Sequence, residues 1–166
     1  AVEARLARAV RGLAVPREVR ERENPVPRSD EALAQGRAHF ADHCSSCHAN
    51  DGSGDTEMGR NLFPKAPDMR LAATQALTDG ELFWVIENGI RFTGMPGWST
   101  GTRQGEEASW HLVHFIRRLP DITEAEVEDM EGLNPRSPEE IRQEIEAERF
   151  LRGDAARPSA PAAHVH

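Results

Sequence analysis

The sequence predicts an all-α protein, and three observations support this fold class. Apolar residues recur at three- and four-residue intervals in several segments, which is the spacing of one helix face. Most of these segments follow a Ser, Thr or Asp that can cap a helix. No segment alternates apolar and polar residues as a half-buried strand does. We therefore expect helices joined by loops.

The N-terminal region, residues 1–28, is expected to hold a short amphipathic helix and a proline-rich linker. Four apolar residues share one face of a helix over residues 1–14: Val2, Leu6, Val10 and Leu13. This basic helix could pack on the rest of the protein or on a partner, or it could flank a lost membrane anchor. Residues 16–28 contain three prolines and no periodic apolar face, which predicts a linker.

The central region, residues 29–120, is expected to be the folded domain. Ser29 or Asp30 can cap a first helix that runs to about Cys44. Residues 49–76 are rich in Gly and Pro and are expected to form loops.

Two further helices are expected in this domain. Thr78 can cap one that stops at Gly89. The other, over residues 105–119, has a broad apolar face and ends at Pro120. A loop containing Gly94-Met95-Pro96-Gly97-Trp98 separates the two.

The C-terminal region, residues 121–166, is expected to be an acidic helical tail. Thr123–Glu126 and Ser137–Glu140 both match the capping-box pattern that begins a helix. The second of these helices should run to about Arg152. Residues 153–163 are rich in Ala and Pro and are expected to be disordered.

Charge is distributed unevenly along the 166 residues, whose net charge is −8. Residues 1–28 carry +3, residues 29–120 carry −4 and residues 121–166 carry −7. An acidic chain repels nucleic acid and should prefer partners with basic docking faces. No apolar run reaches the roughly 18 residues of a membrane span, so an anchor would have to be a segment not in this chain. We expect a monomer.

The most informative motif is Cys44-Ser45-Ser46-Cys47-His48, a C-x-x-C-H pattern typical of c-type haem attachment. Two thiols three positions apart can add to the two vinyl groups along one edge of a haem. The histidine that follows is then placed under the iron. Because the chain has only these two cysteines, we expect one haem c, attached through Cys44 and Cys47. Covalent attachment takes place outside the cytoplasm, which predicts a periplasmic location.

The sequence gives less support to other roles for the two cysteines. A redox C-x-x-C would be expected beside a strand–helix pattern, which the sequence lacks. A structural zinc site would need a second ligand pair at finger-like spacing. A buried cysteine pair without function would not require the adjacent histidine.

The sixth iron ligand is expected to be a methionine, because a closed site suits an iron that only transfers electrons. Met95 lies in a loop bounded by Gly and Pro that can hold a thioether rigidly. Met58 and Met69 follow the haem motif closely and are expected on the His48 side, as core or surface residues. Met130 falls after the last helix of the domain.

The remaining histidines are expected to be solvated or hydrogen-bonded, with His39 or His43 near the haem edge. His164 and His166 could bind copper or nickel weakly, although a free tail end is favoured. Four apolar side chains are candidates for burying the haem: Phe63, Leu82, Trp84 and Ile86.

In order along the chain, the segments CSSCH, APDM, LTDGELFWVIENGI, RFTGMPGW and SWHLVHFIRRLP resemble a class I c-type cytochrome. The similarity is greatest to the cytochrome subunits of bacterial oxidases and dehydrogenases, and it covers about residues 30–120. It implies the cytochrome c fold, a small helical bundle around one covalently attached haem, here with N- and C-terminal helical extensions.

The resemblance also implies roles for single residues. The first and last helices of the domain would cross where Gly36 and Phe40 meet Leu112 and Phe115. The Pro67 carbonyl would accept a hydrogen bond from His48, which with Met95 would ligate the iron. Trp98 would lie near a haem propionate.

The expected function is therefore single-electron transfer between redox partners of a respiratory chain, without enzymatic activity. One alternative is a haem-bearing subunit that works inside a larger membrane complex. Another is a gas sensor or a peroxidase-like enzyme, which would need an open or labile sixth site. The Gly94-Met95-Pro96 loop argues against that alternative.

Overall fold

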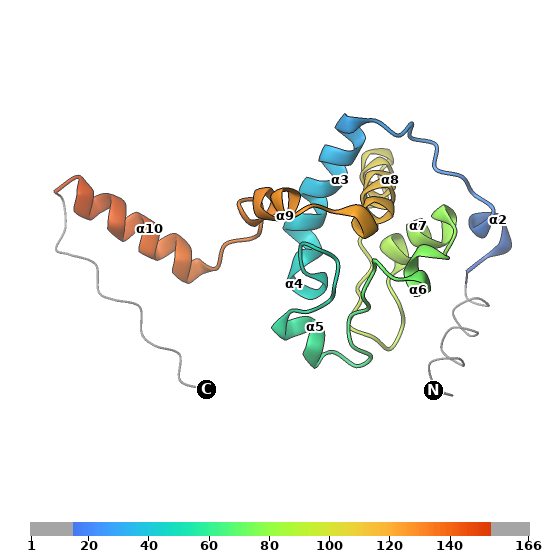
Figure 1. Cartoon of the computed structure of the whole chain (residues 1–166), viewed down its shortest axis with the longest axis horizontal. Coiled ribbons are helices and arrows are strands. Elements are labelled where there is room, and N and C mark those ends of the chain that lie inside the picture. The colour runs from blue at the N-terminus through green and yellow to red at the C-terminus, as the bar shows by residue number, and fades with distance from the viewer. Residues whose placement is uncertain (1–14, 154–166) are drawn as a thin grey trace. The chain divides into compact units, whose positions relative to one another are not determined.

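The computed structural model describes residues 15–153 of the chain (Figure 1). This part is helical and contains no strand, which confirms the expected all-α class. Contacts divide the chain into one compact unit that ends at Asn134 and a second that begins at Pro135. The expected helix over residues 1–14 lies outside the described residues.

Helices α3 (Asp30–His43) and α8 (Arg103–Arg118) pack against each other at the centre of the first unit (Figure 1). Their backbones are in contact at Gly36, where an added Cβ would lie 2.2 Å from the His111 carbonyl oxygen. Beside this contact the Phe40 and Phe115 rings lie with centroids 5.1 Å apart. Gly36 and Phe40 thus meet Phe115, as the resemblance implies.

Helix α7 (Asp79–Asn88) completes the core on the other side of α8. It begins at a capping box, in which the Thr78 side chain accepts from Glu81 N and the Glu81 carboxylate accepts from Thr78 N. Phe83 stacks on Trp110 of α8, with ring centroids 4.2 Å apart. After α3 comes the short helix α4 (Ser45–His48). Residues 49–76, expected to be loop, also contain two short helices, α5 (Glu57–Asn61) and α6 (Ala72–Gln75).

The segment expected to be a linker instead packs on the core. It contains the short helix α2 (Arg17–Arg20), which contacts α7. Val15, just before the segment, is only 3% exposed. Asn24 Nδ2 donates to the Trp110 carbonyl at 3.0 Å, and the Arg22 guanidinium lies over the Trp110 ring. The expectation of a linker was wrong because single polar side chains make these contacts, and they leave no periodic pattern.

The compact unit also extends beyond the expected domain end at residue 120. A single turn of 3₁₀ helix, η1 (Leu119–Asp121), leads to α9 (Glu124–Glu131), which packs against α3. Met130 of α9 is 0% exposed and belongs to the hydrophobic core. Arg118 pairs with Glu126 at 3.0 Å. The burial of Met130 was not predicted, because Met130 is a lone buried apolar residue in an acidic helix.

Met130→Ala is expected to lower the free energy of unfolding by about 2–5 kcal/mol, the usual cost of truncating a buried methionine. Leu133→Ala is the matched control, because Leu133 is 45% exposed and should cost much less. Denaturant unfolding of the haem-loaded protein measures both. Equal effects of the two substitutions would mean that α9 is not part of the folded core.

The second unit contains α10 (Pro138–Leu151), which begins at the capping box of Ser137 and Glu140, as expected. None of its residues is buried, and its ion pairs lie on its own exposed surface, as between Arg152 and Glu148. Within residues 15–153, no helix combines the length and the apolar character needed to cross a membrane.

Candidate haem site

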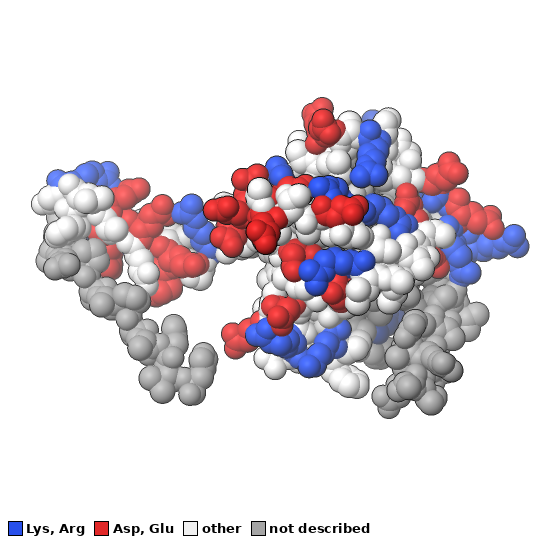
Figure 2. Space-filling view, viewed as in Figure 1, with Lys and Arg blue, Asp and Glu red and all other residues white. Residues whose placement is uncertain are grey.

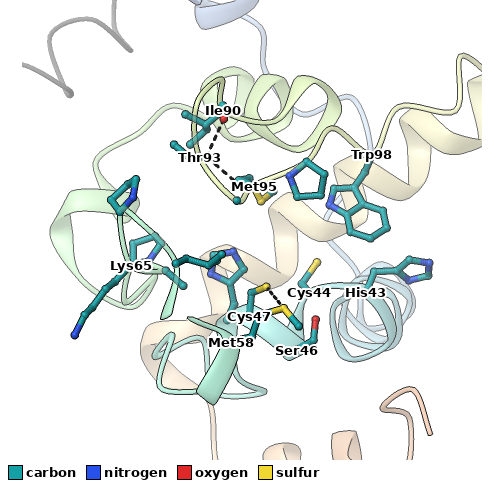
Figure 3. Close-up of a pocket in the computed structure, with 17 residues that line it drawn as sticks. His43, Cys44, Ser46, Cys47, Met58, Lys65, Ile90, Thr93, Met95 and Trp98 are labelled. Atoms are coloured by element: carbon teal, nitrogen blue, oxygen red, sulfur yellow. Dashed lines mark hydrogen bonds between the residues drawn. The ribbon is translucent and has the colours of Figure 1, made fainter. Parts of the chain in front are cut away.

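A single pocket with a volume of about 310 Å³ gathers all six residues that the sequence singled out (Figure 3). Those residues are Cys44, Cys47, His48, Pro67, Met95 and Trp98. The walls come from the end of α3, from α4, from the segment around α5 and from the loop that follows α7. Pockets of about 300–1,000 Å³ are usual for small molecules and cofactors.

The two cysteines lie at the turn where α3 passes into α4: Cys44 separates the two helices and Cys47 belongs to α4. Cys44 N donates to Phe40 O at the end of α3, and His48 N donates to Cys44 O at 2.9 Å. Helical geometry over this turn places Cys44 and Cys47 on the same face, and both are free thiols. Thr56 Oγ1 donates to the Ser46 carbonyl at 2.8 Å and ties the turn to the next segment.

Burial raises the pKa of the Cys44 thiol to about 12, and the neighbouring Cys47 adds to the rise. The attacking thiol of a redox-active dithiol requires the opposite shift, because the thiolate is the nucleophile. The Cys47 thiol donates to Met58 Sδ at 3.2 Å, so Met58 lies beside the motif (Figure 3). The environment of Cys44 therefore argues against Cys44 as the attacking thiol of a redox pair.

The surroundings of the His48 imidazole favour its neutral form. Burial lowers its pKa, and an interaction with the Pro67 backbone partly opposes this shift. The Nδ1 atom is buried without a hydrogen bond of normal geometry. A neutral imidazole is the metal-binding form, and a backbone carbonyl is a common partner for its second nitrogen.

Met95 lies across the pocket from the two cysteines (Figure 3). Its loop is closed by backbone hydrogen bonds, because Ile90 N donates to Met95 O at 3.0 Å. Thr93 reinforces the loop by donating to Ile90 O at 2.8 Å and accepting from Met95 N at 3.2 Å. At the end of α7, Gly89 has φ of 66°, and an added Cβ would lie 2.5 Å from Met95 O.

Trp98 forms the side wall of the pocket and packs against the hydrophobic core. The His43 ring meets it edge to face, with centroids 5.1 Å apart, and His39 lies next to His43 with centroids 4.7 Å apart. Of the two histidines expected near the haem edge, His43 lines the pocket.

The expectation that Phe63, Leu82, Trp84 and Ile86 would bury the haem was wrong. Leu82 and Ile86 belong to the core, Phe63 is exposed, and none of the four candidates lines the pocket. Helix periodicity marks the core face of α7, and the pocket wall comes from the loops on either side. Several pocket residues went unrecognised in the sequence because isolated loop residues leave no pattern: Ser46, Leu62, Pro64, Lys65, Ala66, Ile90 and Thr93.

The family described as "Cytochrome C oxidase, cbb3-type, subunit III" matches residues 31–116. This range is more than half of the chain and contains both the cysteine motif and the Met95 loop. The chain belongs to this family. The cytochrome therefore has a function in haem-based electron transfer, and its family implies a covalently bound haem c.

A solved structure shows the same fold. One chain of the reducing HAO-like protein complex of Kuenenia stuttgartiensis is similar to the cytochrome, with a TM-score of 0.50 and 19% sequence identity. The match covers 57% of this chain and 46% of that chain, so the cytochrome spans less than half of its length.

The residues present fit a haem c. Two thiols on one helix turn lie in the same largely apolar pocket as a buried imidazole and a thioether. These donors are the ones that attach and ligate haem in c-type cytochromes.

Proposed function

We propose that the cytochrome is a monohaem electron carrier, with haem attached through Cys44 and Cys47 and its iron held by His48 and Met95. The observation that carries this proposal is the position of the closed Met95 loop across the pocket from the cysteine motif. The bound haem supplies a one-electron couple. No enzymatic step is proposed.

The protein's part in this function would be to hold the iron through His48 and Met95 with little motion. Burial favours the neutral, metal-binding form of His48, and the nearby Pro67 backbone would orient its ring. The hydrogen bonds of Thr93 would keep the Met95 thioether in place. His/Met ligation raises the reduction potential of c-type cytochromes. Trp98 is proposed to lie beside a haem propionate.

The proposed setting is a periplasmic respiratory chain. Partners with basic faces would be attracted to the acidic surface of α9, where Figure 2 shows acidic side chains gathered. A monomer is proposed. The alternative is a haem-bearing subunit of a larger membrane complex, and the oxidase-subunit description of the family favours it. Isolation of the native protein with a stoichiometric partner would support its being a subunit of a larger complex.

Met95→Ala tests the proposed ligation. The ferric far-red band of a thioether–iron bond is expected in the wild type and should be absent in the variant. The midpoint potential should fall by on the order of 100 mV, within the ~0.8 V range that axial ligands control. An optical redox titration records both quantities.

Met58→Ala is the matched control, because Met58 lines the same pocket beside Cys47. It should keep the far-red band. A wild type that lacks the band and binds carbon monoxide rapidly in the ferrous state would refute the closed site and favour sensing or catalysis.

A further inference from the structure

The helical turn that ends in His48 is bonded to a residue from the far end of the compact unit. Ser45 begins this turn, and Asn50 stands two positions after it. Asn134, three positions beyond the end of α9, contacts both of these side chains. Figure 1 shows how the chain allows this, because α9 lies beside α3 and the last turn of α3 leads into α4. One side chain therefore reaches both ends of the turn that presents His48.

Asn134 and Asn50 form a mutual amide pair. Both ends of the Asn134 amide are satisfied when its oxygen accepts from Asn50 Nδ2 at 3.0 Å and its nitrogen donates to Asn50 Oδ1 at 2.9 Å. In this orientation the Asn134 nitrogen also donates to Ser45 Oγ at 3.2 Å. Ser45 is only 7% exposed, and its hydroxyl donates to the Ala41 carbonyl at 2.6 Å. A continuous set of hydrogen bonds thus joins the segment after α9 to α3 and to the cysteine motif.

The backbone between His48 and Asn50 is strained. Ala49 has φ of 58° and ψ of 158°, a region that is essentially restricted to glycine. Such a conformation persists only where the surrounding contacts hold it. On one side Ala49 N donates to Ser45 O at 2.8 Å, and on the other the Asn50 side chain is held by Asn134. Without the amide pair, the peptide that follows His48 can rotate towards a relaxed conformation.

We propose that Asn134 is a positioning residue for the haem ligand His48, and that it acts through Asn50 and the strained peptide between them. This inference rests on the proposed ligation of the iron by His48. The interaction of the imidazole with the Pro67 backbone depends on where the His48 backbone lies. Partners behind a ligating histidine fix the direction of its ring and raise its basicity. Residue 134 lies beyond the family match, so an extension of this chain supplies the contact.

Asn134→Ala removes the amide pair from the haem-loaded protein. In the ferric state the proton resonances of the haem methyl groups depend on the direction of the axial imidazole plane, so NMR should record a changed methyl pattern. The ratio of reduced to oxidised protein at a fixed applied potential should rise about threefold, less than the roughly 10–100-fold loss of metal affinity when a direct partner of a ligand is removed. The ratio rises because a less basic imidazole stabilises ferric iron less. A methyl pattern identical to that of the wild type would overturn the proposal.

Met130→Ala is the matched control for stability. It loosens the packing of α9 in the core but removes no side chain of the amide pair. The haem methyl pattern of this variant should therefore stay that of the wild type. An equal change in Met130→Ala and Asn134→Ala would show that α9 acts only through the overall stability of the unit, which would overturn the positioning role.

Asn50→Ala tests the same contact from the other side and leaves α9 intact. It should change the haem methyl pattern as Asn134→Ala does. The double variant should add little to either single change, because both substitutions remove one shared interaction. Additive changes would mean that the two side chains act separately and would overturn the proposal. Failure of the proposed His48 and Met95 ligation would differ, since it would appear in the wild type itself as a missing far-red band.

Discussion

Replacing both Cys44 and Cys47 by Ala is expected to abolish covalent haem attachment. The two thiols are free and line the same pocket, and the chain has no other cysteine to replace them. Haem staining after denaturing electrophoresis should be strong for the wild type and absent for the double variant. Each single variant retains one thiol and should keep a weaker, single attachment.

Ser46→Ala is the control for this experiment. Ser46 lies between the two cysteines and lines the same pocket, but its side chain has no reactive thiol. Staining should therefore persist. Haem that remains attached to the double variant after denaturation would place the attachment elsewhere and refute the interpretation of the motif.

Gly36→Ala is expected to destabilise the fold by about 3 kcal/mol or more, beyond the ordinary cost of overpacking. The added Cβ would lie 2.2 Å from the His111 carbonyl oxygen and 2.7 Å from the carbonyl carbon. Because both are backbone atoms, no side-chain rotation relieves the clash, and α3 must move away from α8. Denaturant unfolding of the haem-loaded protein measures the loss.

Gly132→Ala makes the same chemical change where there is space. Gly132 has φ of −68°, and the nearest atom to an added Cβ is 3.8 Å away. Alanine at such a site should be neutral or stabilising by about 0.4–1 kcal/mol. If both glycine variants lost the same stability, the close contact of α3 and α8 would not be the cause.

Much of the helical framework could be predicted from local chemistry. The capping boxes at Thr78, Thr123 and Ser137 place helix starts where the structure has them, because they depend on residues only three positions apart. The cysteine motif and the Met95 loop could likewise be singled out as short segments. The roles of His48 and Met95 as ligands stay predictions.

Long-range contacts of single side chains could not be predicted. Asn24 donates to the Trp110 carbonyl, 86 positions away in the sequence, and no periodic pattern predicts such a bond. Met130 is an isolated apolar residue in an acidic helix, yet it is fully buried. The exposure of Phe63 was missed for the converse reason, since an aromatic residue in a loop gives no sign of which way it faces.

The burial of Met130 has a practical consequence for protein engineering. The family match ends at residue 116, whereas the compact unit continues to Asn134. A gene fragment cut at the family boundary would remove a core side chain and leave apolar surface on α3 and α8 open to water. Chimeras that exchange this cytochrome between host proteins should therefore be joined after Asn134, so that the transferred segment includes the whole hydrophobic core.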